Sequence, residues 1–178
     1  MRAIDLNLSN PGLAEKAAEL GWSETLAAAV FPAGKTPAKA GEIVCAESGD
    51  TEALRRAAAN PRVALLNPLL VKDFHKDDGL VRAVAEAGKA FEIPVRPLLE
   101  KNFVYRAKLM AQLRVFLAKC LKLGAAFVFT SRAQSEFDLK SPQETIALIQ
   151  ALGLSRQQAQ YSITKAPEKI SEAVEWRK

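Results

Sequence analysis

Short apolar segments rich in β-branched residues alternate along this sequence with longer segments that repeat at a helical period. The pattern predicts strands over residues 3–8, 26–31, 42–47, 63–66, 93–98 and 126–130, with helices between most of them. Such alternation is typical of βα units, in which parallel strands form a sheet that is covered by helices. The sequence therefore predicts an α/β fold.

The chain length limits how that sheet can close. A complete (β/α) barrel of eight units usually needs ~250 residues, whereas this chain has 178. We therefore expect one α/β domain over residues 1–178, built as a compact or irregular TIM-like barrel. A doubly wound open sheet is the alternative. The first strand–helix turn, residues 7–12, lacks the glycine-rich pattern of a phosphate loop, which weighs against a nucleotide-binding fold of that kind.

Several helices carry boundary signals. Asp50 can cap a helix that ends near Ala59, and residues 141–144 form a capping box with proline at the first helical position. A further helix is predicted over residues 80–91, and residues 32–41 are predicted to form a loop. The longest helix is predicted over Phe103–Leu123, with Lys108, Gln112, Lys119 and Lys122 facing solvent. Its apolar stripe should face the core and consists of Leu109, Leu113, Phe116, Leu117 and Cys120.

Composition also bears on the cellular compartment. No apolar run approaches the ~18 to 20 residues of a membrane helix, and Asp5 interrupts the segment where a signal peptide would need an apolar core. Cys45 and Cys120 have no metal-ligand spacing and are too few for a disulfide framework. We therefore expect a cytoplasmic protein with no membrane partner.

Positive charge is concentrated in one part of the chain. The formal net charge is +5, and residues 96–140 contain nine basic and three acidic residues, a local charge of +6. In parallel α/β folds the carboxyl ends of the strands share one face, where ligands generally bind. Arg96 lies at the end of a predicted strand, and Lys72, Lys76 and Arg132 lie in segments that follow predicted strands. Lys140 immediately precedes the predicted capping box. We therefore expect these charges to converge on one face.

Arg106 belongs to the same prediction. It lies in the first turn of the long helix, from which its guanidinium could reach the face formed by the strand ends; a structural ion pair is the alternative. Helix N-termini beside such side chains would add backbone donors and positive dipole ends. The arrangement suits phosphate groups.

Signals for catalysis are weak. His75 is the one histidine, so a centre with several histidine ligands is impossible, and no metal site is expected. His75 is either a surface side chain or a catalytic base, and Asp5 either an inward hydrogen-bonding residue or a catalytic carboxylate. No nucleophile elbow or Cys-x-x-Cys motif occurs. The basic face is therefore interpreted as a binding surface.

Four ordered segments resemble the ribonuclease P protein component 3 family, archaeal relatives of a eukaryotic ribonuclease P subunit. They are Val95-Arg96-Pro97-Leu98-Leu99, Tyr105-Arg106-Ala107, Thr130-Ser131-Arg132-Ala133-Gln134 and Asp138-Leu139-Lys140-Ser141-Pro142. The likeness is strongest over residues 76–170, where Lys76-Asp77-Asp78-Gly79-Leu80 and Leu152-Gly153-Leu154-Ser155 also agree. Each piece alone is weak, whereas the ordered set is fairly specific.

The resemblance implies an α/β barrel related to phosphoesterases of the polymerase and histidinol phosphatase type. It implies a protein subunit of the ribonuclease P endoribonuclease, which removes 5′ leaders from precursor tRNA. The catalytic site lies in the RNA of that enzyme, so this chain is expected to bind no cofactor, whereas the RNA requires Mg²⁺. The implied partners are ribonuclease P RNA, other ribonuclease P proteins, precursor tRNA indirectly, and a small ferredoxin-like subunit in a heterodimer or heterotetramer.

The resemblance also implies RNA-contact residues. Arg96, Arg106 and Lys140 match basic positions of the family motifs, and Lys76 is a weaker match. Arg132 departs from the pattern, because Gly or Ser is usual there, so it is either an added phosphate contact or a surface variation. Two rival functions remain: a small barrel hydrolase or lyase that holds a phosphorylated metabolite through Arg96 and Arg132, and a scaffold that contacts only protein.

Overall fold

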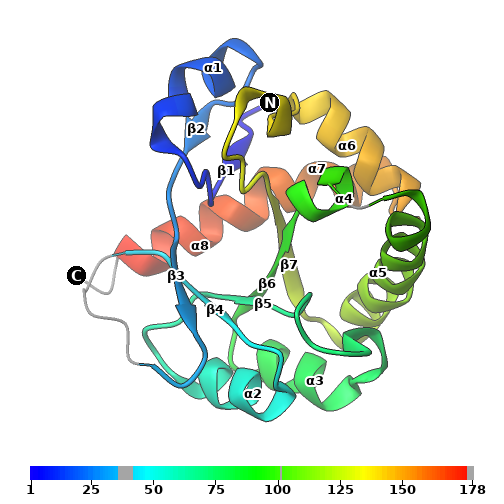
Figure 1. The fold of residues 1–178 in the computed structure, drawn as a ribbon. Coiled ribbons are helices and arrows are strands. Elements are labelled where there is room, and N and C mark those ends of the chain that lie inside the picture. Colours follow the sequence, from blue (N-terminus) through cyan, green and yellow to red (C-terminus); the bar gives the residue numbers. More distant parts are fainter. Residues whose placement is uncertain (36–41, 101, 176–178) are drawn as a thin grey trace.

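The strands of the protein are all parallel and form two hydrogen-bonded groups. The computed structural model describes residues 1–35, 42–100 and 102–175 (Figure 1). Five strands pair in the order β3–β4–β5–β6–β7, and β1 pairs separately with β2. Their bounds are β1 Ile4–Asp5, β2 Glu24–Thr25, β3 Ala29–Pro32, β4 Val44–Glu47, β5 Leu65–Asn67, β6 Ala90–Pro94 and β7 Ala126–Thr130.

Backbone hydrogen bonds join the two groups into a closed ring. On one side the segment from β2 to β3 changes partner, because Leu26 N donates to Asp5 O at 2.7 Å and Ala29 N donates to Ile43 O at 2.8 Å. On the other side Arg132 N donates to Asn7 O at 3.0 Å, which ties the end of β7 to the residues after β1. The fold is thus an irregular α/β barrel, as predicted, and the alternative of an open sheet is wrong.

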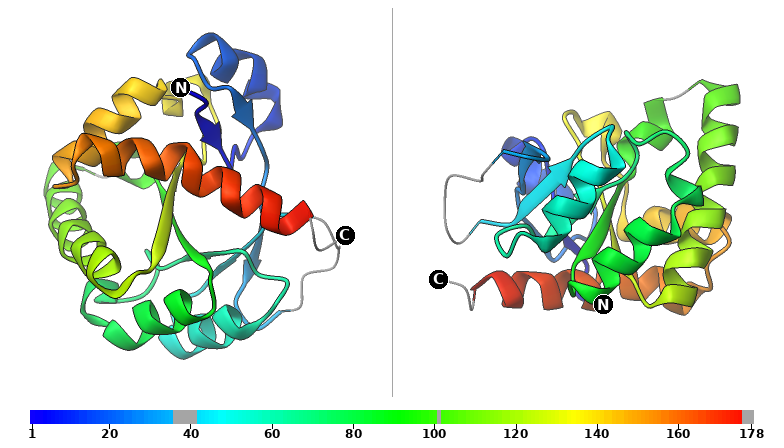
Figure 2. Two further views of the ribbon diagram at one scale, coloured as in Figure 1. Left: turned by 180° about the vertical axis from the view of Figure 1, so that it is seen from behind. Right: turned by 90° about the horizontal axis from the view of Figure 1, so that it is seen from below.

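Helices surround this ring on its outer side (Figures 1 and 2). Outward strand residues such as Leu66, Phe91 and Phe129 are buried in the same apolar cluster as Leu54, Leu80 and Phe116 of the helices. The helices are α1 Ala14–Glu19, α2 Thr51–Ala59, α3 Asp78–Glu86, α4 Arg96–Glu100, α5 Phe103–Leu123, α6 Pro142–Ala151, α7 Arg156–Ile163 and α8 Lys165–Glu175, with short 3₁₀ turns η1 Pro11–Leu13, η2 Phe74–Lys76 and η3 Glu136–Asp138.

Helix α8 covers the amino-terminal end of the barrel. Its residues Ala166, Ile170 and Val174 join a second apolar cluster with inward residues near the starts of the strands, among them Leu65 and Ala90. The left view of Figure 2, seen from behind, shows α8 in red crossing in front of the strands. The barrel mouth is therefore the opposite end, where the strands finish.

Helix signals in the sequence located α2, α5 and the start of α6 correctly. Helix α5 and strand β7 have the predicted bounds, and four of the five stripe residues of α5 are fully buried, with Leu109 packed beside them. Asp50 caps α2 through its carboxylate, and the capping box at Ser141 and Glu144 is formed. Local side-chain to backbone bonds decide these boundaries, so local sequence suffices to predict them.

The segment around β6 was predicted wrongly. The helix predicted over residues 80–91 ends at Glu86, because Gly88 takes a left-handed conformation with φ of 62°. The strand predicted over residues 93–98 lies instead at Ala90–Pro94, and Arg96 begins helix α4. Pro97 favours this helix because proline suits a first helical turn.

Four other strand predictions differ from the structure. The strands predicted over residues 42–47 and 63–66 are β4 Val44–Glu47 and β5 Leu65–Asn67. The strand predicted over residues 26–31 begins only at Ala29, as β3, and β2 Glu24–Thr25 precedes it, since the chain leaves β1 between the two and joins β4. The strand predicted over residues 3–8 is limited to β1 Ile4–Asp5. Part of the loop predicted over residues 32–41, namely 36–41, lies outside the described residues.

Candidate functional site

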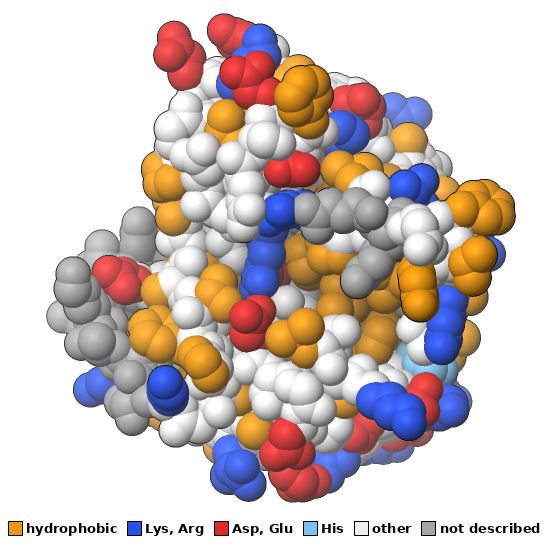
Figure 3. Space-filling model, viewed as in Figure 1, with side chains coloured by type: hydrophobic (Ala, Val, Ile, Leu, Met, Phe, Trp, Pro, Cys, Tyr) orange, Lys and Arg blue, Asp and Glu red, His pale blue; other side chains and the backbone are white. Residues whose placement is uncertain are grey.

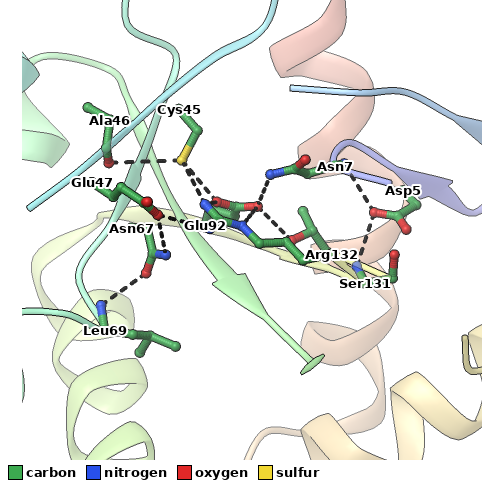
Figure 4. A network of polar contacts seen from close by, with 11 residues as sticks. Asp5, Asn7, Cys45, Ala46, Glu47, Asn67, Leu69, Glu92, Ser131 and Arg132 are labelled. Atoms are coloured by element: carbon green, nitrogen blue, oxygen red, sulfur yellow. Dashed lines mark hydrogen bonds and ion pairs between the residues drawn. The ribbon is translucent and has the colours of Figure 1, made fainter. Parts of the chain in front are cut away.

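A polar network fills the barrel interior just below its mouth (Figure 4). At its centre is Glu92 of β6, whose side chain is fully buried. Glu92 Oε1 accepts hydrogen bonds from Asn7 Nδ2 at 2.7 Å, Thr130 Oγ1 at 2.8 Å and Arg132 Nε at 3.0 Å. Glu92 Oε2 accepts from Arg132 Nη2 at 2.5 Å and from Cys45 Sγ at 2.9 Å. This carboxylate therefore links side chains from the two sides of the barrel.

Arg132 is the cation of this network. Besides its two bonds to Glu92, its Nη1 donates to Glu47 Oε2 at 2.9 Å, and its side chain is 17% exposed. Its backbone has φ of 47°, a left-handed conformation that costs a non-glycine residue about 1–3 kcal/mol. The hydrogen bond from Arg132 N to Asn7 O and the side-chain bonds offset that cost. The residue is held in place by its surroundings.

The charges in this network stabilise one another. Burial alone would raise the pKa of Glu92, but hydrogen bonds and the positive charge of Arg132 lower that pKa below its usual value. Burial would lower the pKa of Arg132, which the hydrogen bonds and charge of Glu92 raise instead. Burial, followed by the charge of Glu92, raises the pKa of the Cys45 thiol well above its usual value. The interior thus contains an ionised carboxylate–guanidinium pair and a neutral thiol.

A cavity opens above the network, at the carboxyl ends of the strands. It has a volume of about 660 Å³ and is lined by residues that follow β5, β6 and β7 and by residues of α5. Apolar side chains such as Leu69 and Leu109 line it together with the polar ends of Arg132 and Asn67. Figure 3 looks into this hollow, where orange side chains lie in its depth and blue side chains at its border.

Of the predicted RNA-contact residues, Arg96 and Arg106 contact α4 at this mouth, and Lys140 lies in the segment that pairs with Arg96. Arg96 is the first residue of α4, and its Nε lies 3.7 Å from the Asp138 carboxylate. Lys140 follows Asp138 by two residues, and its Nζ donates to Phe137 O and Leu139 O at 3.0 Å each. Arg106 Nη2 donates at 3.0 Å to the carbonyl of Leu99, within α4. We call Arg96, Arg106 and Lys140 the basic rim.

Tertiary contacts fix the position of Lys140. Trp22 Nε1 donates to Lys140 O at 2.8 Å, which joins the segment before α6 to the segment after α1. The capping box of α6 begins at the next residue, Ser141. The hydrogen bond from Trp22 and the start of α6 therefore fix the backbone of Lys140.

The other two predicted contact residues are placed differently. Lys76 lies in η2, is 69% exposed and forms an ion pair with Asp73 at 3.5 Å. Arg132 lines the cavity, but its guanidinium is held by Glu92 and Glu47. It is therefore no surface variation, and its geometry favours a structural role over the phosphate contact that the sequence suggested.

The contacts of Asp5 favour the structural alternative over the catalytic one. Its Oδ1 accepts hydrogen bonds from Asn7 N and Ser131 N, each at 3.1 Å, where β1 meets the end of β7. Burial, only partly offset by these hydrogen bonds, raises its pKa to about 6. His75 lies outside the lining of the cavity, next to Phe74 with ring centroids 5.8 Å apart.

Sequence reasoning missed the interior acids. Glu92 was assigned to no strand, because the predicted strand began one residue later. A signal was present: inward residues become polar toward the ends of β4 to β7, as in Cys45 then Glu47, or Val128 then Thr130. Lys108 and Lys122 are exposed, as predicted, although Lys108 also lines the cavity. Gln112 is half-buried in the cavity lining, and Lys119 is 18% exposed and paired with Asp78.

Two searches of the described residues give negative results. Within residues 1–35, 42–100 and 102–175, no group of three or more His, Cys, Asp or Glu side chains is placed to hold a metal ion. Over the same residues, no helix is long and apolar enough to cross a bilayer.

Two curated proteins that are similar to this chain in sequence have the same name. Ribonuclease P protein component 3 of Methanosarcina barkeri is 35% identical over 133 residues, which are 74% of this chain and 56% of that relative. The Methanosarcina acetivorans protein of the same name is 40% identical over 124 residues, 68% of this chain and 52% of that relative. The chain spans about half the length of these curated relatives.

A solved structure with low sequence identity to this chain has a similar fold. A chain in the cryo-EM structure of an archaeal ribonuclease P with mature tRNA aligns with a TM-score of 0.77 and 18% identity, covering 97% of this chain and 91% of that one. The family model of ribonuclease P subunit p30 matches residues 12–178. The chain therefore belongs to the ribonuclease P subunit p30 family.

Proposed function

We propose that this chain is a protein subunit of ribonuclease P, which binds and stabilises the catalytic RNA that removes the 5′ leader of precursor tRNA. The observation that carries the proposal is the basic rim: Arg96 begins α4, Arg106 reaches the α4 carbonyl of Leu99, and Lys140 lies two residues after the Asp138 that pairs with Arg96. Family membership supports it. Relatives named ribonuclease P protein component 3 support it as well.

The rim acts on RNA through charge. Arginine can hold a phosphate bidentately, whereas lysine acts as a point charge. Neutralising phosphates reduces repulsion within the folded RNA, so the RNA needs less Mg²⁺ to fold. Because these contacts involve the sugar-phosphate backbone, they carry little sequence preference.

The chain itself contributes no catalytic group in this proposal. The carboxylates of Glu47 and Glu92 at the mouth are held by Arg132. The same contacts disfavour the rival hydrolase or lyase, which needed Arg132 for its phosphorylated metabolite. The RNA supplies the active site and its Mg²⁺, and the chain binds no cofactor.

The proposal includes protein partners and a compartment. A small ferredoxin-like subunit pairs with this chain in a heterodimer or heterotetramer, and other ribonuclease P proteins complete the endoribonuclease. Precursor tRNA is contacted indirectly. Both cysteines are free thiols, in keeping with the reducing cytoplasm in which we place the complex.

Reconstitution tests this function. The chain, its small partner and ribonuclease P RNA are combined at limiting Mg²⁺, and cleavage of precursor tRNA is measured. We expect the wild-type chain to support cleavage and the triple variant with Arg96, Arg106 and Lys140 changed to alanine to need more Mg²⁺.

A matched control removes three exposed charges at the far end of the barrel, Arg156, Lys165 and Lys169 on α7 and α8. It should behave as wild type. Equal Mg²⁺ demand for wild-type and rim-variant complexes, with the variant folded, would contradict the assignment of the rim. Turnover of a phosphorylated metabolite by the isolated chain would instead favour the enzyme.

A further inference from the structure

The mouth cavity differs in character from the basic rim beside it. With a volume of about 660 Å³, it falls within the ~300–1,000 Å³ of pockets that enclose small organic ligands. A phosphate contact on a rim needs no such depth. Binding of the RNA sugar-phosphate backbone at the rim therefore leaves the cavity unoccupied.

Apolar side chains line part of this cavity. Leu69, Leu109 and Pro97 contribute apolar atoms, and Tyr105 adds an aromatic ring at its border, where the side chain is 63% exposed. Aromatic and apolar side chains of this kind stack on unpaired nucleobases. The lining thus offers surface to the faces of a planar group.

Amide groups in the lining are available for hydrogen bonding. The side chains of Gln112 and Gln134 make no hydrogen bond to any other residue of the described ranges. Asn67 differs, because its Oδ1 accepts from Leu69 N at 3.0 Å and its Nδ2 donates to Glu47 at 3.4 Å. Two uncommitted amides, each with donors and an acceptor, suit the edge of a nucleobase.

The charge balance of the lining favours an anion. Of its two acids, Glu47 pairs with Arg132 and Asp73 pairs with Lys76. Lys72 and Lys108 line the same cavity, and among the described residues neither forms an ion pair. Positive charge therefore remains beside the apolar and amide surfaces.

We propose that this cavity takes one unpaired nucleotide of an RNA strand, with its base inside the cavity and its phosphate beside Lys72 and Lys108. The inference rests on the proposed function, because the rim brings RNA to the mouth. It adds a site for a base, which the rim does not provide. A duplex, whose bases are stacked and paired, fits the rim but not the cavity.

The test uses a short unstructured RNA oligonucleotide, a copy whose positions are all abasic, and the same sequence as a duplex. Binding to the full chain is measured by fluorescence anisotropy. We expect the abasic copy to bind the wild-type chain about 5- to 150-fold more weakly, the range that corresponds to loss of one stacked base.

A cavity-filling variant locates the effect. Gln112→Trp should lower affinity for the intact strand to that for the abasic strand, with duplex affinity unchanged. Val115→Trp is the matched control, because Val115 lies on the same helix, is 51% exposed and does not line the cavity. If Gln112→Trp fails to fold, the exposed Lys108→Glu serves instead and should weaken binding of intact and abasic strands alike.

Several outcomes would overturn the proposal. One is equal affinity of the wild-type chain for intact and abasic strands, and another is no binding of single strands. Occupancy by free AMP as tight as by the strand would identify a small-molecule site. If intact and abasic strands bind alike while the rim variant still loses ribonuclease P RNA, the cavity assignment fails and the proposed function stands.

Discussion

Arg132→Met tests whether this arginine holds the barrel together. Methionine keeps much of the apolar length of the side chain but removes two hydrogen bonds to Glu92 and one to Glu47. Hydrogen bonds to charged groups contribute about 1.5–3 kcal/mol each. Breaking one partner of a buried ion pair costs about 3–5 kcal/mol. Because Glu92 is fully buried, we expect the free energy of unfolding at pH 7 to fall by about 3–5 kcal/mol.

The loss should depend on pH. In the wild type the pKa of Glu92 is lowered, so its stabilising contribution is present above its ordinary value of ~4.3 and lost as pH falls. Without Arg132, burial raises this pKa, so the stability of the variant should fall as pH rises above that value. The difference between the two proteins should therefore widen from pH 4 to pH 7.

Urea unfolding followed by circular dichroism measures this difference, with m-values compared to detect changes in the unfolded state. Arg156→Met, an exposed arginine of α7, is the control and should change stability by less than about 0.5 kcal/mol. The double variant Arg132→Met, Glu92→Gln should recover part of the loss, since no buried charge remains. Wild-type stability of Arg132→Met at pH 7 would refute the reasoning.

Two further substitutions have expected outcomes. Burial raises the pKa of Asp5 to about 6, so folding favours its protonated form. The free energy of unfolding of Asp5→Asn, relative to that of wild type, should therefore rise by up to ~3 kcal/mol from pH 4 to 7. A difference that does not change with pH in urea titrations would contradict this. Phe116 is fully buried against Phe74 and Phe91, with ring centroids 5.2 Å and 4.9 Å away. Phe116→Ala should lower the free energy of unfolding by about 3–5 kcal/mol. A decrease below about 1 kcal/mol in urea unfolding would mean that the site is not packed as described.

Local signals explain why much of the fold could be predicted. Helix α5 has a continuous apolar stripe, and Gly124, with φ of 76°, caps its C-terminal end. Nearby residues therefore predict both the buried face and the end of this helix. The capping box at Ser141 similarly fixes the start of α6. Alternating strands and helices then indicate a parallel sheet, and short length indicates an irregular barrel.

Long-range contacts explain what could not be predicted. Barrel closure depends on bonds such as that from Arg132 N to Asn7 O, which joins residues far apart in the chain. The burial of Glu92 depends on partners from β4, β7 and the segment after β1. Neither contact has a local sequence signature, so Arg132 could be predicted to lie at the mouth but not to turn inward.

For the basic residues, the sequence could predict a shared face but not which of them contact RNA. Parallel strands bring their ends together, and on that ground Arg96 and Lys140 were expected at one face. The structure pairs Arg96 with Asp138, two residues before Lys140, and Arg106 reaches the α4 carbonyl of Leu99. Their contact with RNA stays a prediction.

The salt dependence of RNA binding tests that contact most directly. The dissociation constant for ribonuclease P RNA is measured across a series of salt concentrations for the wild-type chain and the triple alanine variant of the rim. Each lost phosphate contact should reduce the log–log slope by roughly 0.7–0.9. Three contacts predict a slope shallower by about 2–3, whereas identical slopes for the two proteins would show that the rim does not bind RNA phosphates.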